Sequence, residues 1–213
     1  MFGLRNDGTV SRFNGVLPLR VDNLLGLTNV RAVRAGSFYG TALVVLPTRQ
    51  TISGVATDVS DLLAAPIDPA LPKKDRKELE KALEAIVDSL TADQWLGDEA
   101  LTAAKGEKTF EGLEKAVDSL TKSITNKPEL VDDAAFVSSV EEAVLTLLSA
   151  ASTLARTALE AAATGGGDVH KLSEGVQAYQ AGEALATSDG KKNASKAMDE
   201  YEKAWKKAQQ SLK

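Results

Sequence analysis

The spacing of apolar residues along the chain changes near residue 72. Over 73–90, apolar residues recur every three or four positions, with lysine and glutamate between them. This period places the apolar side chains on one face of a helix and the charges on the opposite face. The stripe comprises Leu79, Ala82, Leu83, Ile86, Val87 and Leu90. We therefore predict a helix over this segment.

The same period predicts two further helices in the middle of the chain. One stripe covers 110–124 and stops near Asn126 and Pro128. Another covers 132–163, which would form a helix roughly 45 Å long at 1.5 Å per residue. We expect this long helix to be the central one. The segment before 110 contains Trp95, which we place in a loop or short turn that covers one end of the bundle.

Two more helices are predicted towards the C-terminus. Three glycines at 165–167 should end the central helix, because glycine is costly inside a helix, and Asp168 can cap the next one. Segment 188–193, SDGKKN, then turns the chain into a last helix with an apolar stripe over 194–212. The sequence thus predicts a five-helix bundle over 73–213.

Residues 1–57 carry strand signals instead. Asp7-Gly8 is a hairpin turn pair, and strand-favouring residues lie between glycine-rich breaks further on. Those residues are Val30, Val33, Thr41, Leu43 and Val45. Segment 58–72 contains three prolines, which hold the preceding residues out of the helical region, and is predicted to be an extended linker. The expected fold class is α+β: a small antiparallel β-hairpin segment over 1–57, a linker, and a mostly α-helical bundle.

The β segment resembles a repeat of the regulator-of-chromosome-condensation family, whose blades read G-L-x-x-V-x-x-I-A-A-G-x-x-H-S-x-A-L and then x-x-D-G-T-V. The first motif is matched by Gly26, Leu27, Val30, Val33, Ala35, Gly36, Ala42 and Leu43, and the second by Leu4, Asp7, Gly8, Thr9 and Val10. The two motifs occur in swapped order, and Tyr39 and Gly40 replace the usual His-Ser pair. The resemblance implies a terminal or degenerate blade of a β-propeller.

A single propeller blade buries its faces against neighbouring blades and has too little core to stand alone. Either preceding blades are missing from this chain, or the strands lean on the helical part; we favour missing upstream blades. Segment 90–120 is also similar to a helical segment of repeat-bearing bacterial surface proteins, with a Trp loop, a Gly-Lys step and a Phe-led helix. Neither resemblance brings an active site with it.

Composition and charge exclude several classes of ligand and of catalytic site. The formal net charge is −5, which argues against a nucleic-acid-binding surface. The absence of cysteine excludes disulfides, thiolate catalysis and cysteine-ligated metals.

The N-terminus has no basic region followed by an apolar run, so no signal peptide is predicted and the chain as written is expected to stay in the cytoplasm. The charge-free window 143–155 is too short for a roughly 30 Å hydrocarbon layer, and we expect a buried helix there and no membrane span.

The search for catalytic and ligand-binding residues predicts none. His170 follows Asp168 at a helix start, no Ser-His-Asp set accompanies it, and we expect an exposed polar residue. The glycine-rich 164–168 could offer N–H groups to an anion, but it lacks the Gly-Lys-Ser/Thr ending of a phosphate-binding loop. Segment 189–193 lacks the oxygen ligands of a calcium loop. No metal and no cofactor are therefore predicted.

Charged clusters and tryptophans have structural explanations. The pairs Asp132-Asp133 and Glu141-Glu142 lie near a predicted helix start, where the dipole favours acids, and the lysines at 203, 206, 207 and 213 lie near a helix end. We read those lysines as a solvated face. Trp95 and Trp205 could mark a partner site if exposed, but both occupy bundle-facing positions, and we expect them in the core.

We therefore expect a non-catalytic structural or protein-binding module of a bacterial extracytoplasmic or surface repeat protein, not an enzyme. The alternative is a fragment of an intracellular propeller-type regulator that binds a protein partner. Upstream blades with a signal peptide would favour the first, and blades without one the second. A deep pocket with converging acids would revive an enzymatic function.

Overall fold

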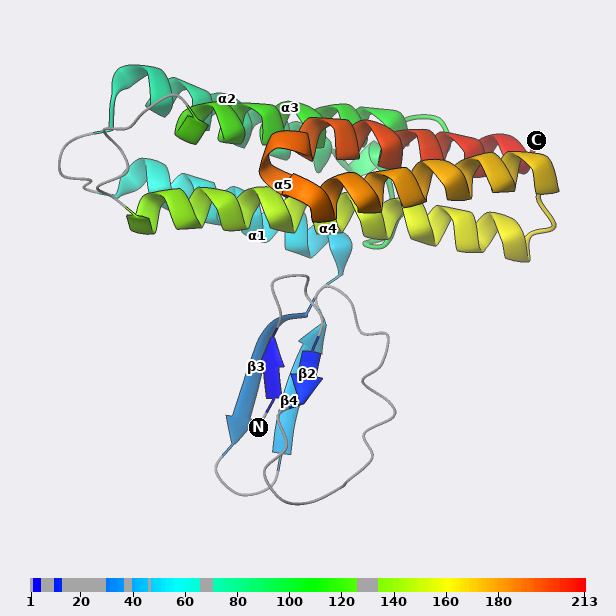
Figure 1. The fold of residues 1–213 in the computed structure, drawn as a ribbon, viewed down its shortest axis with the longest axis horizontal. Helices are drawn as coiled ribbons and strands as arrows, with labels where there is room; N and C mark the ends of the chain where they lie inside the picture. The colour runs from blue at the N-terminus through cyan, green and yellow to red at the C-terminus, as the bar shows by residue number, and fades with distance from the viewer. Residues whose placement is uncertain are drawn as a thin grey trace.

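The computed structural model describes residues 2–4, 10–12, 30–36, 40–45, 47–65, 71–125 and 134–213. Helices dominate these ranges; four short strands precede α1, and two more lie between α2 and α3 (Figure 1). The elements in chain order are β1 (Phe2–Leu4), β2 (Val10–Arg12), β3 (Val30–Gly36), β4 (Gly40–Val45), α1 (Thr48–Ala64), α2 (Lys73–Ser89), the 3-10 helix η2 (Ala92–Gln94), β5 (Trp95–Leu96), β6 (Ala100–Leu101), α3 (Gly106–Thr125), α4 (Ala134–Thr164) and α5 (Val169–Ser211). The predicted α+β class with a helical bundle is confirmed.

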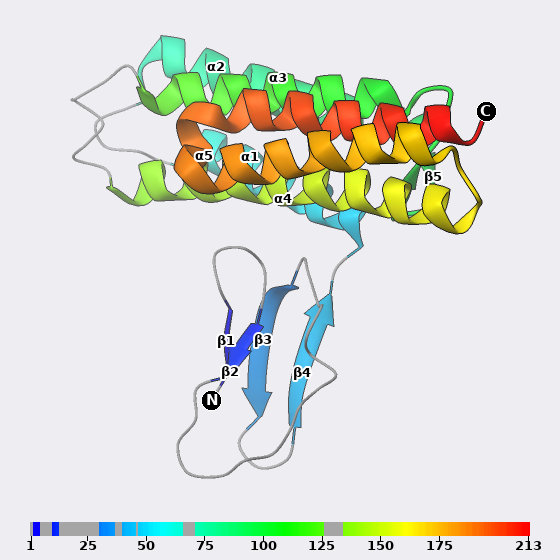
Figure 2. The ribbon, with the colours of Figure 1, turned by 45° about the vertical axis from the view of Figure 1, so that its right-hand side comes forward.

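The strands pair as antiparallel two-stranded ladders: β1 with β2, β3 with β4, and β5 with β6. In the β3–β4 ladder Val33 lies opposite Leu43, and the register shifts between Val30 and Ala32. Figures 1 and 2 show β1 to β4 outside the bundle, with β4 leading towards α1. The predicted Asp7-Gly8 turn and the Gly26-Leu27 match lie outside the described residues.

Helix α1 corrects the predicted domain boundaries. Strand structure to residue 57 and an extended linker from residue 58 were expected, but residues 48–64 form a helix of 17 residues. Ile52, Val55 and Val59 are buried at helical spacing, so packing overrides the strand preference of these β-branched side chains. The helix ends at Ala65, whose ψ of 136° is the extended conformation favoured before a proline.

One continuous core joins the helices. Helix α2 packs against α3 and α1, and α4 packs against α5, α1 and α3. Each helix contributes side chains that are almost completely buried, at 1% exposure or less: Ile52 from α1, Ile86 from α2, Leu113 from α3, Leu147 from α4 and Tyr201 from α5. The buried surface therefore extends through the bundle and includes α1.

Helix α5 doubles back on itself, and its two arms lie side by side (Figures 1 and 2). The N–H of Asp168 donates to the carbonyl of Ser211 at 2.9 Å, so the two ends of the hairpin meet. Nearer the reversal, a Cβ on Gly182 would lie 2.7 Å from the ring of Tyr201, so only glycine allows this approach. The two arms correspond to the two predicted C-terminal helices. With α1, the bundle has one helix more than predicted.

Helix α4 covers the predicted central helix almost residue for residue. Val140, Leu147 and Leu154 are buried in the bundle. By length and composition alone, Ala135–Thr164 is also apolar enough to cross a membrane, and 44% of its most apolar window is buried. The apolar stretch is thus longer than the charge-free window suggested, and the absence of a membrane span stays a prediction.

Candidate functional site

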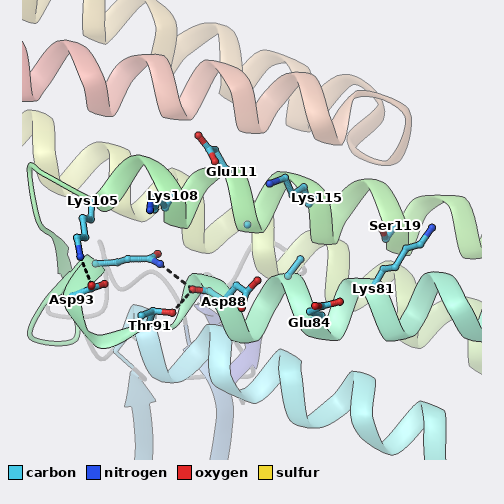
Figure 3. A pocket seen from close by; sticks show the side chains of 13 residues that line it. Lys81, Glu84, Asp88, Thr91, Asp93, Lys105, Lys108, Glu111, Lys115 and Ser119 are labelled. Carbon is cyan, nitrogen blue, oxygen red and sulfur yellow. Dashed lines mark hydrogen bonds and ion pairs between the residues drawn. The ribbon is translucent and has the colours of Figure 1, made fainter.

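A groove of about 700 Å³ runs between α2 and α3 (Figure 3). The two helices approach closely beneath it, because a Cβ on Gly112 would lie 2.9 Å from the carbonyl oxygen of Ala85 and 3.0 Å from Cβ of Ser89. Small residues thus form the base, and long charged side chains form the rims. No sequence pattern indicates this groove, since its lining comes from two helices and the turn between them.

The groove has walls of mixed charge. Lys108 and Lys115 line it from α3, and Glu84 and Asp88 line it from α2. An ion pair between Lys105 and Asp93 joins the two walls at one end (Figure 3). Lys105 and Asp93 are about half exposed, so this pair has a modest effect on stability. Such a surface can bind a charged or polar partner.

A buried hydrogen-bond cluster closes the bundle end beside the groove. Thr109 Oγ1 donates to Gln94 Oε1 at 2.7 Å, and Gln94 Nε2 donates to the Asp88 carbonyl at 3.0 Å. Trp95 is 5% exposed, and its Nε1 donates to the Ser89 carbonyl at 2.8 Å. The indole covers the bundle end as predicted, although Trp95 begins strand β5 and does not lie in a loop or short turn. The cluster is internally satisfied and has a structural role.

A second polar network lies between α4 and the two arms of α5. Ser152 Oγ donates to Glu183 Oε1 at 2.7 Å, and Tyr201 Oη donates to the same oxygen at 2.7 Å. Tyr179 Oη lies 3.1 Å from Ser152 Oγ. Burial is the largest cause that raises the pKa of both tyrosines, so both remain neutral donors. The Ser152 and Tyr201 hydroxyls share one carboxylate oxygen, Tyr179 joins them through Ser152, and the network links three helical segments.

The predicted helix start at Asp168 is confirmed. Asp168 accepts a hydrogen bond from the Lys171 N–H at 2.9 Å, and Gly166 has a φ of 75° in the turn before it. The side chain of His170 is 80% exposed, with Nε2 3.6 Å from Glu174 Oε1. It is therefore the exposed polar residue expected from the sequence.

The lysines of the last helix pair with acids. Lys203 pairs with Glu200, and Lys207 pairs with Glu174 of the other α5 arm. Lys206 pairs with both Glu202 and Glu107. Lys203 and Lys213 are exposed, as predicted for a solvated face, whereas Lys206 and Lys207 are partly buried and connect separate helical segments. The last turn of α5 contains no basic residue, so the helix dipole does not explain these lysines.

The prediction for Trp205 is confirmed, whereas the one for the acidic pair on α4 is wrong. Trp205 is 3% exposed, which confirms its place in the core. Glu141 and Glu142 lie beyond the first turn of α4, where the helix dipole no longer favours acids, so that explanation does not apply to them. Asp132 and Asp133 lie outside the described residues.

An acidic cluster on α3 and α5 gives a testable pH effect. Burial, followed by the carboxylates of Asp199, Glu202 and Asp118, raises the pKa of Glu114 above its ordinary 4.5. A raised folded-state pKa means that folding disfavours the ionised form, so Glu114 lowers stability at neutral pH and ceases to do so as pH falls through that pKa.

We expect Glu114→Gln to stabilise the protein at pH 7.5 by less than about 1 kcal/mol, the range for partly exposed charges. The gain should disappear near pH 3.5, where the glutamate is neutral in both states. Thermal unfolding of both proteins at the two pH values measures this. Glu111→Gln, at an exposed position of the same helix, is the control. An equal gain at both pH values would contradict the electrostatic explanation.

Comparison with known proteins gives no further assignment. No protein-family model, no curated protein and no solved structure matches this chain. Within the described ranges, no three His, Cys, Asp or Glu side chains gather into a group that could hold a metal ion. The groove between α2 and α3, with charged side chains on both walls, is the candidate surface for binding.

Proposed function

We propose that this protein is a non-catalytic structural or protein-binding module, in which the N-terminal strands belong to a larger β structure and the helices form a self-supporting body. One observation carries the proposal: in the part of residues 1–46 that the structure describes, β1–β2 and β3–β4 are two-stranded ladders with β1 beside β3, whereas the helices share one continuous core. An isolated two-stranded hairpin is marginally stable at best in water, and its free edges favour pairing with more strands.

The partner that fits the strands best is further β repeats of the same kind. The resemblance of segment 1–57 to the regulator-of-chromosome-condensation repeat supports this choice, and the similarity of 90–120 to repeat-bearing bacterial surface proteins supports an extracytoplasmic setting. In this proposal the α2–α3 groove offers a charged, solvent-exposed surface to a protein partner. The bundle then displays or anchors the repeats.

Hydrogen exchange of the full chain, read by mass spectrometry, tests the proposal. We expect amides of α1 to α5 to stay protected for at least a hundredfold longer than those of β1 to β4, because two-stranded ladders are marginally stable in water whereas the helices share one core. Adding any repeats encoded upstream should protect the strands. Strand protection equal to that of the bundle in the monomer would contradict the proposal, and repeats without a signal peptide would favour an intracellular regulator.

A further inference from the structure

The start of α1 has no cap from its own sequence. Pro47 occupies the N-cap position and makes no side-chain hydrogen bond, and the first turn contains no acidic residue. The first N–H groups of a helix have no intrahelical acceptor, and burial without one is costly. Thr48 is nevertheless completely buried. The acceptors must therefore come from elsewhere in the fold.

They come from the turn between β5 and β6, about fifty residues further along the chain. Glu99 Oε2 accepts from Thr48 Oγ1 at 2.9 Å and lies 3.4 Å from the Thr48 N–H nitrogen. The carbonyl of Asp98 accepts from the Arg49 N–H at 3.0 Å. Gly97, with a φ of 70°, makes the turn that presents both acceptors. A carboxylate at this position also complements the positive end of the helix dipole.

The side chain of Arg49 also holds the first turn of α1 against the rest of the bundle. Its Nη2 donates to the Leu90 carbonyl at 2.9 Å, and its guanidinium carbon lies 5.8 Å from the centre of the Trp95 ring, within cation–π range. Trp95 is itself held by its hydrogen bond to Ser89. Backbone, carboxylate and guanidinium contacts thus converge on the residues that directly follow Pro47.

We propose that the β5–β6 turn is a clasp that fixes the first turn of α1, so that the strand segment leaves the bundle in one set direction and not through a flexible linker. The contacts are non-local and lie where the chain passes from the strands to the helices. Holding Thr48 and Arg49 fixes the direction in which the chain enters α1. The inference does not depend on what the strands bind.

The full chain has no cysteine, so Val45→Cys with Lys77→Cys provides two unique spin-label sites, one at the end of β4 and one on the exposed side of α2. We expect a narrow distance distribution by pulsed electron paramagnetic resonance. Glu99→Ala or Arg49→Met should broaden it at least twofold. Exchange of the Arg49 amide should also become at least tenfold faster in Glu99→Ala.

Glu80→Ala, which removes an exposed carboxylate that pairs with Arg76 on α2, is the matched control and should change neither measurement. If Glu99→Ala loses helical circular dichroism, Thr48→Val, which replaces the hydroxyl with a methyl group of similar size, is used in its place. A broad distance distribution in the parent protein would overturn the proposal. So would variants whose distance distribution and Arg49 amide exchange equal those of the parent protein. Fast exchange in the strands alone would not, because it reports on their pairing and not on the junction.

Discussion

Replacing Trp205 by alanine is expected to lower the free energy of unfolding by about 3–5 kcal/mol. Its indole is 3% exposed and lies against Phe110, with ring centroids 5.9 Å apart. It also packs over Gly106, where a Cβ would come within 2.6 Å of the indole. Truncation would therefore leave a cavity between α3 and α5. Urea unfolding followed by circular dichroism measures the loss.

Val87→Ala is the matched control, because Val87 belongs to a predicted apolar stripe but is 54% exposed. We expect its free energy of unfolding to change by no more than about 0.5 kcal/mol. If Trp205→Ala were equally mild, the indole would not be a core residue, and a partner site at this position would become the better explanation.

Much of the bundle could be predicted because helical spacing is a local signal. Leu79 and Ile86 lie in the middle of their predicted stripe and are completely buried, whereas Val87 lies at its edge and is exposed. The periodic pattern fixes which face is buried, but not how far the neighbouring helices extend over it. Helix α1 was missed because Ile52, Val55 and Val59 are β-branched and follow strand signals, and only tertiary packing shows that they face a core.

Polar contacts between residues close in the sequence could likewise be predicted, whereas contacts between distant residues could not. Asp168 caps a helix through a residue three positions away, so its role follows from sequence order. Ser152 and Glu183 are 31 residues apart, and no spacing rule brings them together. The α2–α3 groove depends in the same way on Gly112 of one helix meeting Ala85 of another. Sequence patterns identify the elements, while packing decides which polar groups meet.

Glu183→Ala should destabilise the protein by about 2–4 kcal/mol, since it removes the acceptor shared by Ser152 and Tyr201. Tyr201 is 1% exposed, and its hydroxyl would lose its carboxylate acceptor and keep only the Ser152 hydroxyl as a neighbour; a buried polar group that loses its partner costs about 1–3 kcal/mol. Glu183→Gln keeps an acceptor oxygen at the same place and should cost less than about 1 kcal/mol. Urea unfolding of the two variants against the parent protein measures the difference.

A double-mutant cycle with Tyr201→Phe separates the hydrogen bond from general packing. In the parent protein this change removes a satisfied donor and should cost about 1 kcal/mol. In Glu183→Ala the same hydroxyl has lost its acceptor, so its removal should cost nothing or restore some stability, giving a coupling of at least about 0.5 kcal/mol. If Tyr201→Phe had the same cost in both backgrounds, the carboxylate would not be the acceptor that joins the arms of α5 to α4. The hairpin would then be held by its apolar seam and by the ion pair between Glu174 and Lys207.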